Sequence, residues 1–574
     1  MNSLISILLL SLNINTIFSS GIHHVRLHQE GDRSKACLII SESENVTYKD
    51  LNSNDVNALS ILSKPAISSA NDNLTKESVN SNIIELYSYS KSIIDAHIQS
   101  ICSKVENLKP LSSSAKNSND DVAINAPDVR KIVDNGDAAN RIDVVFMGDG
   151  YTASEKTKFF SDISRLTTDM FEGPTFKSWL PLFNIWAIHV ESVDSGIGYN
   201  GAKNTPFKLY REAGQLRAIF TGNSNYARQI CQLTGSNACD YPSLIANDDY
   251  YGGLGGEFVI STKSARTGTV VLRHEMGHNF VSVGEEYDNG QVYSGVNAAT
   301  SINTGWKNWI SGPVREEKAI YRLLEYPWHN LANGQKSFTF TSDGKFKRWY
   351  LLTSVTAAGE ANSLEFVLDG KVLPWQARGS DDREFYDWRG EQGFTAGTHT
   401  LTVRSKTAST NQDIPRMIAS VTLHEFGDEN EFKIANDNYS AYPTWDVNRR
   451  KTYRPTNAGC LMRNMTHNSF CNVCKEGMWF QFLKRISLID GVKADKTKIS
   501  LSTLKIGQFR TPTPVPGEKL SITWTLNNQV QTQFKDQLEI LNPSSGSWSV
   551  TVEFISPEIR TASTHTKDVK SFTV

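Results

Sequence analysis

The chain has 574 residues, of which 39% are hydrophobic and 21% are charged. A chain of this length is expected to form roughly two to four domains, and the composition is that of a globular protein in water. The formal net charge of −2 gives no electrostatic reason to expect nucleic acid or an anionic membrane surface as a partner.

A short apolar run near the N-terminus predicts export. It occupies residues 4–12 and is followed by the small polar residues Ser19 and Ser20, so residues 1–20 have the length of a signal peptide, although the usual preceding positive charge is absent. No later run is long enough to span a bilayer. We therefore expect a secreted, extracellular protein; a buried N-terminal strand or helix is the alternative. Sequons at Asn45, Asn73, Asn438 and Asn464 fit a secreted glycoprotein.

Residues 21–125 are rich in Ser and Asn and contain few apolar runs, the clearest at residues 83–87. Residues 109–128 have the composition of a linker. We expect this N-terminal region to be either a removable prosegment or a small accessory domain, and the sequence leaves both open.

From residue 141 the sequence has the pattern of alternating strands and helices. We expect residues 126–318 to form the first part of a domain. Residues 142–146 predict a strand, residues 154–171 a helix, and residues 183–190 and 257–260 two further strands. Strands that alternate with helices in this way indicate an α/β fold. The glycine-rich residues 252–256 lack the Lys-Ser/Thr ending of a nucleotide-binding loop, which favours a loop at the edge of a cleft.

The motif His274-Glu275-Met276-Gly277-His278 lies in a predicted helix that begins near Thr267 or Thr269 and ends before Gly284. Residues four apart on a helix are neighbours on one face, so the two imidazoles can bind one zinc ion. A chance match to this motif in a chain of this composition is on the order of one in a hundred. The helical spacing of the surrounding apolar residues further favours a zinc site.

A catalytic zinc ion usually has three protein ligands, so a third donor is expected after the helix. Glu285 is our first choice because it directly follows Gly284; Glu286 and then Asp288 are the alternatives. Glu275 is expected to act as the general base beside the metal-bound water without binding the metal. Tyr287 is a candidate donor to the oxyanion, and packing alone is its alternative role.

Later segments predict β structure. Residues 346–352, 364–368, 399–403 and 417–423 alternate as strands do, so residues 319–425 are expected to form a β-sandwich inserted into the first domain. Its tryptophans are more often core residues than sugar-binding platforms. Residues 426–487 are expected to complete the first domain, and residues 488–574 to form an immunoglobulin-like β domain.

Seven cysteines allow at most three disulfides and leave one thiol over. Cys231 and Cys239 close a short loop and are the most secure pair. Cys460, Cys471 and Cys474 lie close to His467, which permits a structural zinc site or a redox pair. In a secreted chain a disulfide between two of these three cysteines is the stronger expectation.

The chain resembles a secreted zinc metallopeptidase family named for its IgA-cleaving member. The resemblance rests on blocks that cover most of residues 141–310 and 450–485, and it says little about either end of the chain. The blocks are residues 144–152, 181–186, 252–256, 274–287, 460–463 and 470–474.

The resemblance implies a metzincin-like catalytic domain in which His274 and His278 bind zinc and Glu275 is the base. It also implies an acidic third ligand where related folds often have a third histidine. The family pattern is Asp-Glu-Tyr, whereas this chain has Glu285-Glu286-Tyr287, so the extra methylene leaves the choice between Glu285 and Glu286 open. Met462 would then fill the methionine turn beneath the metal, and an ordinary core methionine is the alternative.

Together these features predict a secreted zinc metalloendopeptidase with one catalytic Zn²⁺ and a protein or peptide substrate. A zinc amidase or deacylase with the same ligands is one alternative. A non-catalytic adhesion or glycan-binding protein, which contacts glycans through its β domains, is the other. The second alternative leaves Glu275 without a role, because a structural zinc site needs no base and closes all four positions.

Overall fold

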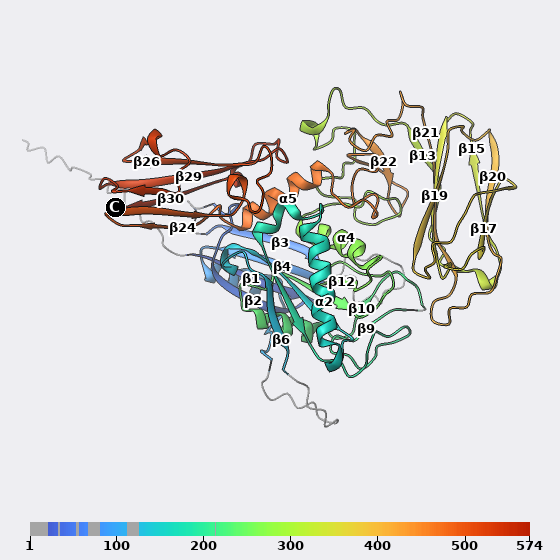
Figure 1. Ribbon diagram of the computed structural model, residues 1–574, viewed down its shortest axis with the longest axis horizontal. Helices are drawn as coiled ribbons and strands as arrows, with labels where there is room; N and C mark the ends of the chain where they lie inside the picture. The colour runs from blue at the N-terminus through green and yellow to red at the C-terminus, as the bar shows by residue number, and fades with distance from the viewer. Residues whose placement is uncertain are drawn as a thin grey trace, which may run out of the picture.

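The computed structural model describes residues 21–31, 35–52, 55, 57–66, 81–111, 126–212 and 214–574. The protein is a mixed α/β structure with many sheets and few helices, and it is elongated, with the C-terminal sheets at one end and a β insert at the other (Figure 1). The expected signal peptide, Asn73 and most of the expected linker lie outside the described residues. Among the described residues, no helix is long and apolar enough to cross a membrane.

The N-terminal unit is a five-stranded sheet in the order β3-β4-β1-β2-β5 with one helix packed on it. The apolar run noted at residues 83–87 lies in β4, which pairs with β3 and β1 and is buried at every position after its first. A disulfide joins Cys37 to Cys102, a pairing that the spacing of the cysteines does not reveal. The elements are β1 (Ile22–Gln29), β2 (Ala36–Val46), β3 (Leu59–Pro65), β4 (Asn82–Ser88), α1 (Lys91–Ile101) and β5 (Lys104–Asn107).

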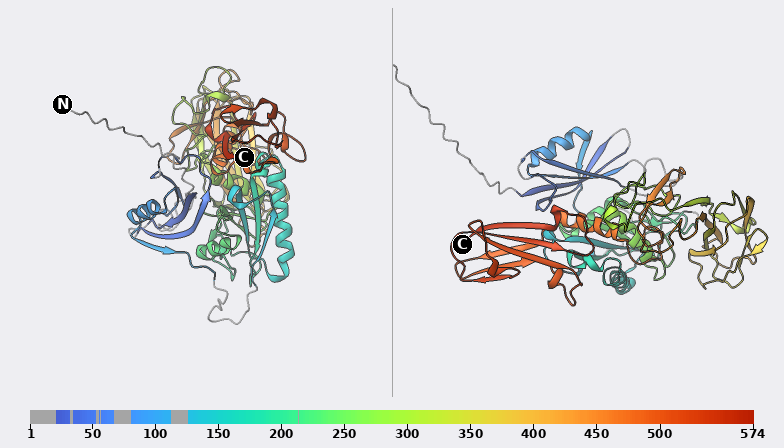
Figure 2. Two further views of the ribbon diagram at one scale, coloured as in Figure 1. Left: turned by 90° about the vertical axis from the view of Figure 1, so that its left-hand side faces the viewer. Right: turned by 90° about the horizontal axis from the view of Figure 1, so that it is seen from above.

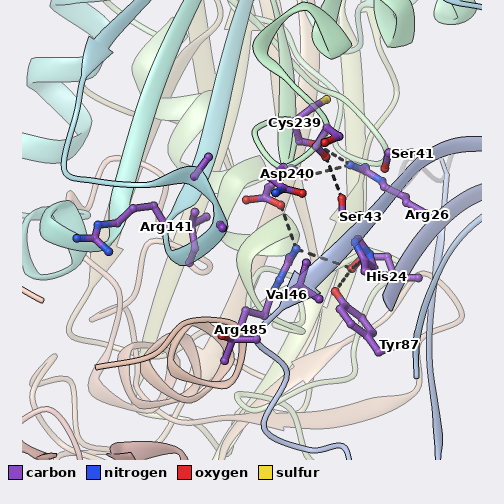
Figure 3. Close-up of a pocket in the computed structure, with 17 residues that line it drawn as sticks. His24, Arg26, Ser41, Ser43, Val46, Tyr87, Arg141, Cys239, Asp240 and Arg485 are labelled. Atoms are coloured by element: carbon purple, nitrogen blue, oxygen red, sulfur yellow. Dashed lines mark hydrogen bonds and ion pairs between the residues drawn. The ribbon is translucent and has the colours of Figure 1, made fainter. Parts of the chain in front are cut away.

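The N-terminal unit lies beside the central unit in both views of Figure 2, and polar contacts join the two. Arg26 donates through Nη1 to the carbonyl oxygens of Cys239 (3.1 Å) and Asp240 (3.0 Å). Arg485 Nη2 lies 3.1 Å from Asp240 Oδ1 and 4.0 Å from Glu85 Oε2, so one buried cation serves a carboxylate from each unit. These residues surround a cavity of about 50 Å³, which is small and polar (Figure 3). We interpret it as part of the interface between the two units.

The central unit is built on the sheet β12-β11-β7-β8-β6, in which β6 alone is antiparallel to its neighbour. Both faces are covered, so its four parallel strands are buried at nearly every position, as is typical of parallel sheets. In β7, Val144 and Phe146 face a core shared with α2, α4 and α5, while Val145 and Met147 face a second core shared with α3. The elements are β6 (Asp128–Val133), β7 (Ile142–Asp149), α2 (Lys156–Thr167), β8 (Phe183–His189), α3 (Ser224–Cys231), β11 (Tyr241–Ala246), β12 (Val259–Thr262), α4 (Gly268–Phe280) and α5 (Asn472–Arg485).

The predicted α/β pattern is present, with shifted boundaries. The helix predicted at residues 154–171 is α2, and its last turn widens into a π-helical turn at Thr168–Glu172. The strand predicted at residues 257–260 is β12, which begins two residues later. Strands β6 and β11 were not predicted. Small strand pairs border this unit: β9 (Leu209–Tyr210) with β10 (Phe220–Thr221), and β22 (Tyr442–Trp445) with β23 (Lys451–Arg454).

Two sheets that enclose one apolar core form the insert at the right of Figure 1. One sheet has the order β13-β21-β16-β19, with β14 also paired to β21, and the other has the order β15-β20-β17-β18. Three tryptophans of the insert, Trp349, Trp375 and Trp388, pack against this core, as expected. The strands are β13 (Ala319–Glu325), β14 (His329–Asn330), β15 (Lys336–Ser342), β16 (Arg348–Thr356), β17 (Leu364–Leu368), β18 (Lys371–Val372), β19 (Glu384–Gly390), β20 (Gly397–Ser405) and β21 (Met417–Phe426).

The C-terminal unit pairs a three-stranded sheet, β24-β25-β28, with a four-stranded sheet, β27-β26-β29-β30. Trp524 and Trp548 are fully buried in a core that is continuous with the one around α5. The C-terminal unit therefore packs firmly against the central unit. Its strands are β24 (Ile489–Ala494), β25 (Lys498–Thr503), β26 (Lys519–Leu526), β27 (Gln529–Val530), β28 (Glu539–Leu541), β29 (Ser547–Ile555) and β30 (Lys567–Thr573).

Candidate metal centre

Helix α4 carries the His-Glu-x-x-His motif on the edge of the central sheet, next to β12. Its N-cap is Thr267, whose side chain donates to Asp382 Oδ2 (2.7 Å) in the insert and makes no cap hydrogen bond. Gly277 allows α4 to approach a later segment closely, because a Cβ there would lie 2.8 Å from the Phe470 ring and 3.4 Å from Met462 Sδ. Met462 is fully buried beneath the helix, consistent with a packing role.

Three side chains converge at one point beside α4. Nε2 of His274 lies 3.1 Å from Glu285 Oε2, and Nε2 of His278 lies 3.1 Å from Glu285 Oε1. All three donor atoms lie within 4.8 Å of one another. Helix α4 ends at Phe280, earlier than expected, and Gly284 lies in the turn that brings Glu285 back to the histidines.

The three side chains fit a metal ion. Zinc held tetrahedrally at about 2.0–2.1 Å puts its nitrogen and oxygen ligands about 3.3 Å apart, close to the observed separations. Glu285 Oε2 is a buried atom that makes no hydrogen bond among the described residues, and its nearest polar neighbour there is His274 Nε2 at 3.1 Å. His278 Nδ1 lies 3.0 Å from the carbonyl oxygen of Val283, which can only accept, so Nδ1 carries a proton and Nε2 is the ring nitrogen that faces the cluster.

The charges of the cluster are strongly coupled. Burial alone would lower the pKa of His278, but the Glu285 carboxylate outweighs it and raises that pKa to about 9. Burial alone would raise the pKa of Glu285, but the two imidazoles hold it below its usual range. Glu285 is therefore an anion stabilised by positive charge at the histidines, and a divalent cation bound there would take the place of the proton on His278.

Glu275 faces the same cleft from α4 without joining the cluster of three. Burial raises the pKa of its carboxyl group. A carboxylate in this position can exchange a proton with a water molecule near the three donors.

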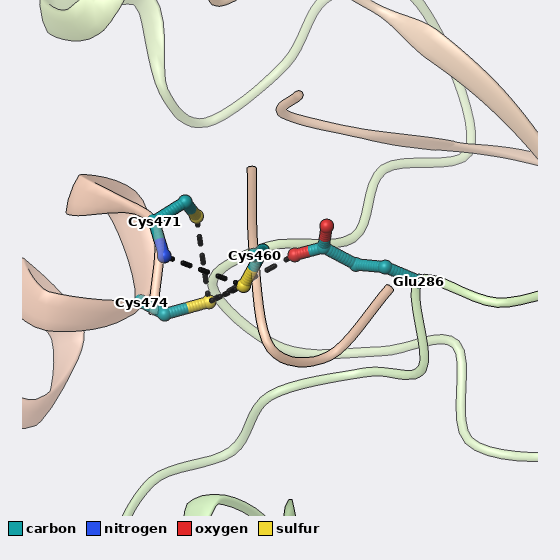
Figure 4. A group of neighbouring side chains, drawn as sticks. All are labelled: Glu286, Cys460, Cys471 and Cys474. Atoms are coloured by element: carbon teal, nitrogen blue, oxygen red, sulfur yellow. Dashed lines mark hydrogen bonds between the residues drawn. The ribbon is translucent and has the colours of Figure 1, made fainter. Parts of the chain in front are cut away.

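Glu286 and Asp288, the alternative ligands, point elsewhere. Glu286 is fully buried and faces Cys460, Cys471 and Cys474 (Figure 4). Asp288 forms a buried ion pair with Arg463 and accepts the backbone N–H of Trp445 (2.9 Å). Of the three acidic residues considered, Glu285 alone lies with the histidines.

Two residues hold the turn that carries Glu285. Asn297 accepts the N–H of Gly284 (2.7 Å) and donates to Glu286 Oε1 (2.8 Å). Arg463 donates to the carbonyl oxygen of Glu286 (3.0 Å). Asn297 has no signal in the sequence that would reveal this role, whereas Arg463 lies in a block that carries the family resemblance.

Tyr287 lines the cleft, and its ring centroid is 6.0 Å from that of His274. Burial raises the pKa of its hydroxyl well above the usual value, so the hydroxyl keeps its proton and can donate a hydrogen bond.

The predicted disulfide between Cys231 and Cys239 is present. The disulfide expected among Cys460, Cys471 and Cys474 is not formed: these three thiols are free and buried. His467 is not part of their cluster, and its Nδ1 lies 2.9 Å from the carbonyl oxygen of Ser469.

The metal centre opens into a cleft of about 1500 Å³. The glycine-rich loop borders it through Gly253–Gly256, as expected from the sequence. The insert contributes Tyr350, Arg383 and Phe385, and the N-terminal unit contributes Ser63 and Lys64. Three units of the chain therefore surround one site. That residues from the insert and the N-terminal unit line it was not predicted from the sequence.

An α/β sheet with a His-Glu-x-x-His helix at its edge, and a carboxylate against both imidazoles, is the arrangement of a metallopeptidase. Residues 130–349 match the family model described as IgA Peptidase M64, which confirms the resemblance to the IgA peptidase family over that segment. This match supports a peptidase that acts through a bound metal.

No curated protein matches the chain. Among solved structures, the CBM35 module from Cellvibrio japonicus Abf62 has 14% identity, covering 20% of this chain and 96% of its own, with a TM-score of 0.13. A family 35 carbohydrate binding module from an environmental isolate has 12% identity, covering 21% and 84%, with a TM-score of 0.13. With TM-scores this low, neither structure indicates the fold or a ligand of this chain.

Proposed function

We propose that the chain is a secreted zinc metalloendopeptidase whose metal is held by His274, His278 and Glu285. The observation that carries the proposal is the convergence of these three donors in a cleft that Glu275 also faces. Three protein ligands leave one position open, which distinguishes a catalytic zinc site from a closed structural one. Bound there, zinc would make a nucleophile of water near neutral pH and polarise the scissile carbonyl.

In this proposal Glu275 moves the proton. Its carboxylate takes a proton from the attacking water and later gives it to the leaving amine. A raised pKa suits both roles, because the carboxyl group must hold the proton between the two steps. Tyr287 is positioned to donate a hydrogen bond to the oxyanion, since its hydroxyl stays protonated and lines the same cleft.

A metzincin-like organisation is part of the proposal. An acidic third ligand follows the helix, and Met462 packs against α4 at Gly277, where a methionine turn would support the histidines. The carbonyl oxygen of Met462 also accepts the N–H of Glu286 (3.1 Å), which ties the methionine segment to the ligand turn.

A protein or peptide substrate fits the shape of the site. The cleft is large, about 1500 Å³, and has both apolar and charged walls, among them Phe385 and Arg383. An extended chain of several residues would fill it, whereas the acyl group of a small amide would fill only part of it. Ser63 and Lys64 of the N-terminal unit line the cleft. If this unit is a removable prosegment, it would restrict substrate entry until it is cleaved. If it is an accessory domain, it would form a permanent wall of the cleft.

The substrate class is tested by incubating the full chain, before and after controlled proteolysis of its N-terminal region, with a denatured protein and with small acyl amides. New N-termini in the protein, identified by mass spectrometry, are the expected result. Hydrolysis of the amides with the protein left intact would instead support an amidase or deacylase.

A further inference from the structure

A second group of metal-binding side chains lies behind the ligand turn, on the side away from the cleft. It consists of Glu286, Cys460, Cys471 and Cys474 (Figure 4). All four are buried, and their donor atoms lie within 4.8 Å of one another. They come from three separate segments, since Glu286 follows α4, Cys460 precedes Met462, and Cys471 and Cys474 begin α5.

The spacing of these atoms matches a tetrahedral ion. Zinc–sulfur bonds of about 2.3 Å in a tetrahedron separate the sulfurs by about 3.8 Å. Sγ of Cys474 lies 3.8 Å from that of Cys460 and 3.7 Å from that of Cys471. The same geometry puts a carboxylate oxygen about 3.6 Å from each sulfur. Glu286 Oε1 lies 3.9 Å from Cys474 Sγ.

The cluster has a polar atom without a partner. Glu286 is fully buried; its Oε1 accepts from Asn297, but its Oε2 has no hydrogen-bond partner among the described residues. Oε1 is the oxygen nearer the sulfurs, 3.9 Å from Cys474 Sγ. A fully buried carboxylate costs free energy unless positive charge lies beside it, and a cation within the cluster would supply that charge.

The number of thiols also favours an ion. The two disulfides of the structure use four of the seven cysteines, and the other three are those of this cluster. A further disulfide would leave one buried thiol over, whereas three thiolates and one carboxylate complete a four-coordinate site with nothing left over. The formal ligand charge equals that of a four-cysteine zinc site.

The surrounding backbone accommodates negative charge. Cys471 is the N-cap of α5, a helix of 14 residues, and Cys474 lies in its first turn. The N-terminus of a helix stabilises anions through its free N–H groups. The N–H of Cys471 lies 3.4 Å from Cys460 Sγ, in position to donate to a thiolate.

We propose that Cys460, Cys471, Cys474 and Glu286 form a second metal site, which binds a thiophilic divalent cation of the zinc type in a closed, structural role. The ion joins the turn that carries Glu285 to the Met462 segment and to α5. It therefore holds Glu285 in position through its neighbour Glu286, and takes no part in the chemistry in the cleft.

The test uses the full chain, purified under reducing conditions, depleted of metal and reconstituted with Co²⁺. Sulfur-to-cobalt charge-transfer absorption in the near ultraviolet is the expected result, with one ion bound at each cluster. The His274, His278 and Glu285 site has no sulfur, so these bands report the cysteine cluster alone. The bands are expected to persist in His278→Ala and to weaken or disappear in Cys474→Ser.

Two results would overturn the proposal. One is cobalt bound without charge-transfer bands while all three thiols react freely with a thiol reagent. The other is a disulfide among the three cysteines, found by peptide mapping of the alkylated wild-type chain. Both results are obtained with the wild-type chain, so neither requires that a variant folds. Failure of the peptidase proposal would leave the bands unchanged, so the two failures are distinguishable.

Discussion

Glu275→Gln is expected to abolish peptide hydrolysis while leaving the fold and the bound metal unchanged. Glutamine has nearly the same shape but cannot accept a proton, so the water loses its base. Removal of a general base typically costs about 10²–10⁴ in rate. We expect a loss of about a thousandfold in kcat, measured by the release of new N-termini, at an unchanged thermal midpoint.

The matched control is Glu212→Gln, the same chemical change at an exposed residue outside the cleft. It is expected to retain full activity. If Glu275→Gln kept more than about a tenth of the wild-type rate, another group would have to be the base.

Glu285→Gln and Glu286→Gln are expected to separate the two metal sites. Glu285 lies 3.1 Å from both imidazoles, whereas Glu286 faces the three thiols. Glu285→Gln should weaken metal binding at the histidines by more than the roughly 10–100-fold lost when a residue that only orients a ligand is changed. Activity should fall with it.

Glu286→Gln is expected to keep the ion at the histidines. Competition with a chelator, followed by metal analysis of each variant, measures both effects. An account in which Glu286 is the third catalytic ligand predicts the reverse, with Glu286→Gln losing that ion and Glu285→Gln keeping it.

The motif on α4 was predictable because the helical spacing of His274 and His278 is a local property of the sequence. The choice between Glu285 and Glu286 was not, because neighbouring residues in a non-helical turn point in different directions. Which of them faces the histidines depends on Asn297 and Arg463, which hold the turn from elsewhere in the chain.

The cysteines show the same limit. Cys231 and Cys239 are 8 residues apart, so their pairing follows from the short loop that they close. Cys37 and Cys102 are 65 residues apart, and only the folded N-terminal sheet brings them together. Once four cysteines are used in this way, the remaining three cannot all pair with one another, and their convergence with Glu286 becomes visible only in three dimensions.

In the insert, β16, β17, β20 and β21 were predicted from alternation, whereas β6 and β11 of the central unit were missed. Tyr241–Ala246 is buried at every position because it lies inside a parallel sheet with both faces covered. Such a short run has no period of its own, and it cannot be told from other apolar segments by sequence alone.

The most direct test of the central claim is cleavage of a denatured protein by the purified chain, measured together with its metal content during chelation and zinc readdition. The account predicts that cleavage falls as the ion at the histidines is removed and returns as zinc is restored. Cleavage that continues in a chain shown to be free of metal would contradict it.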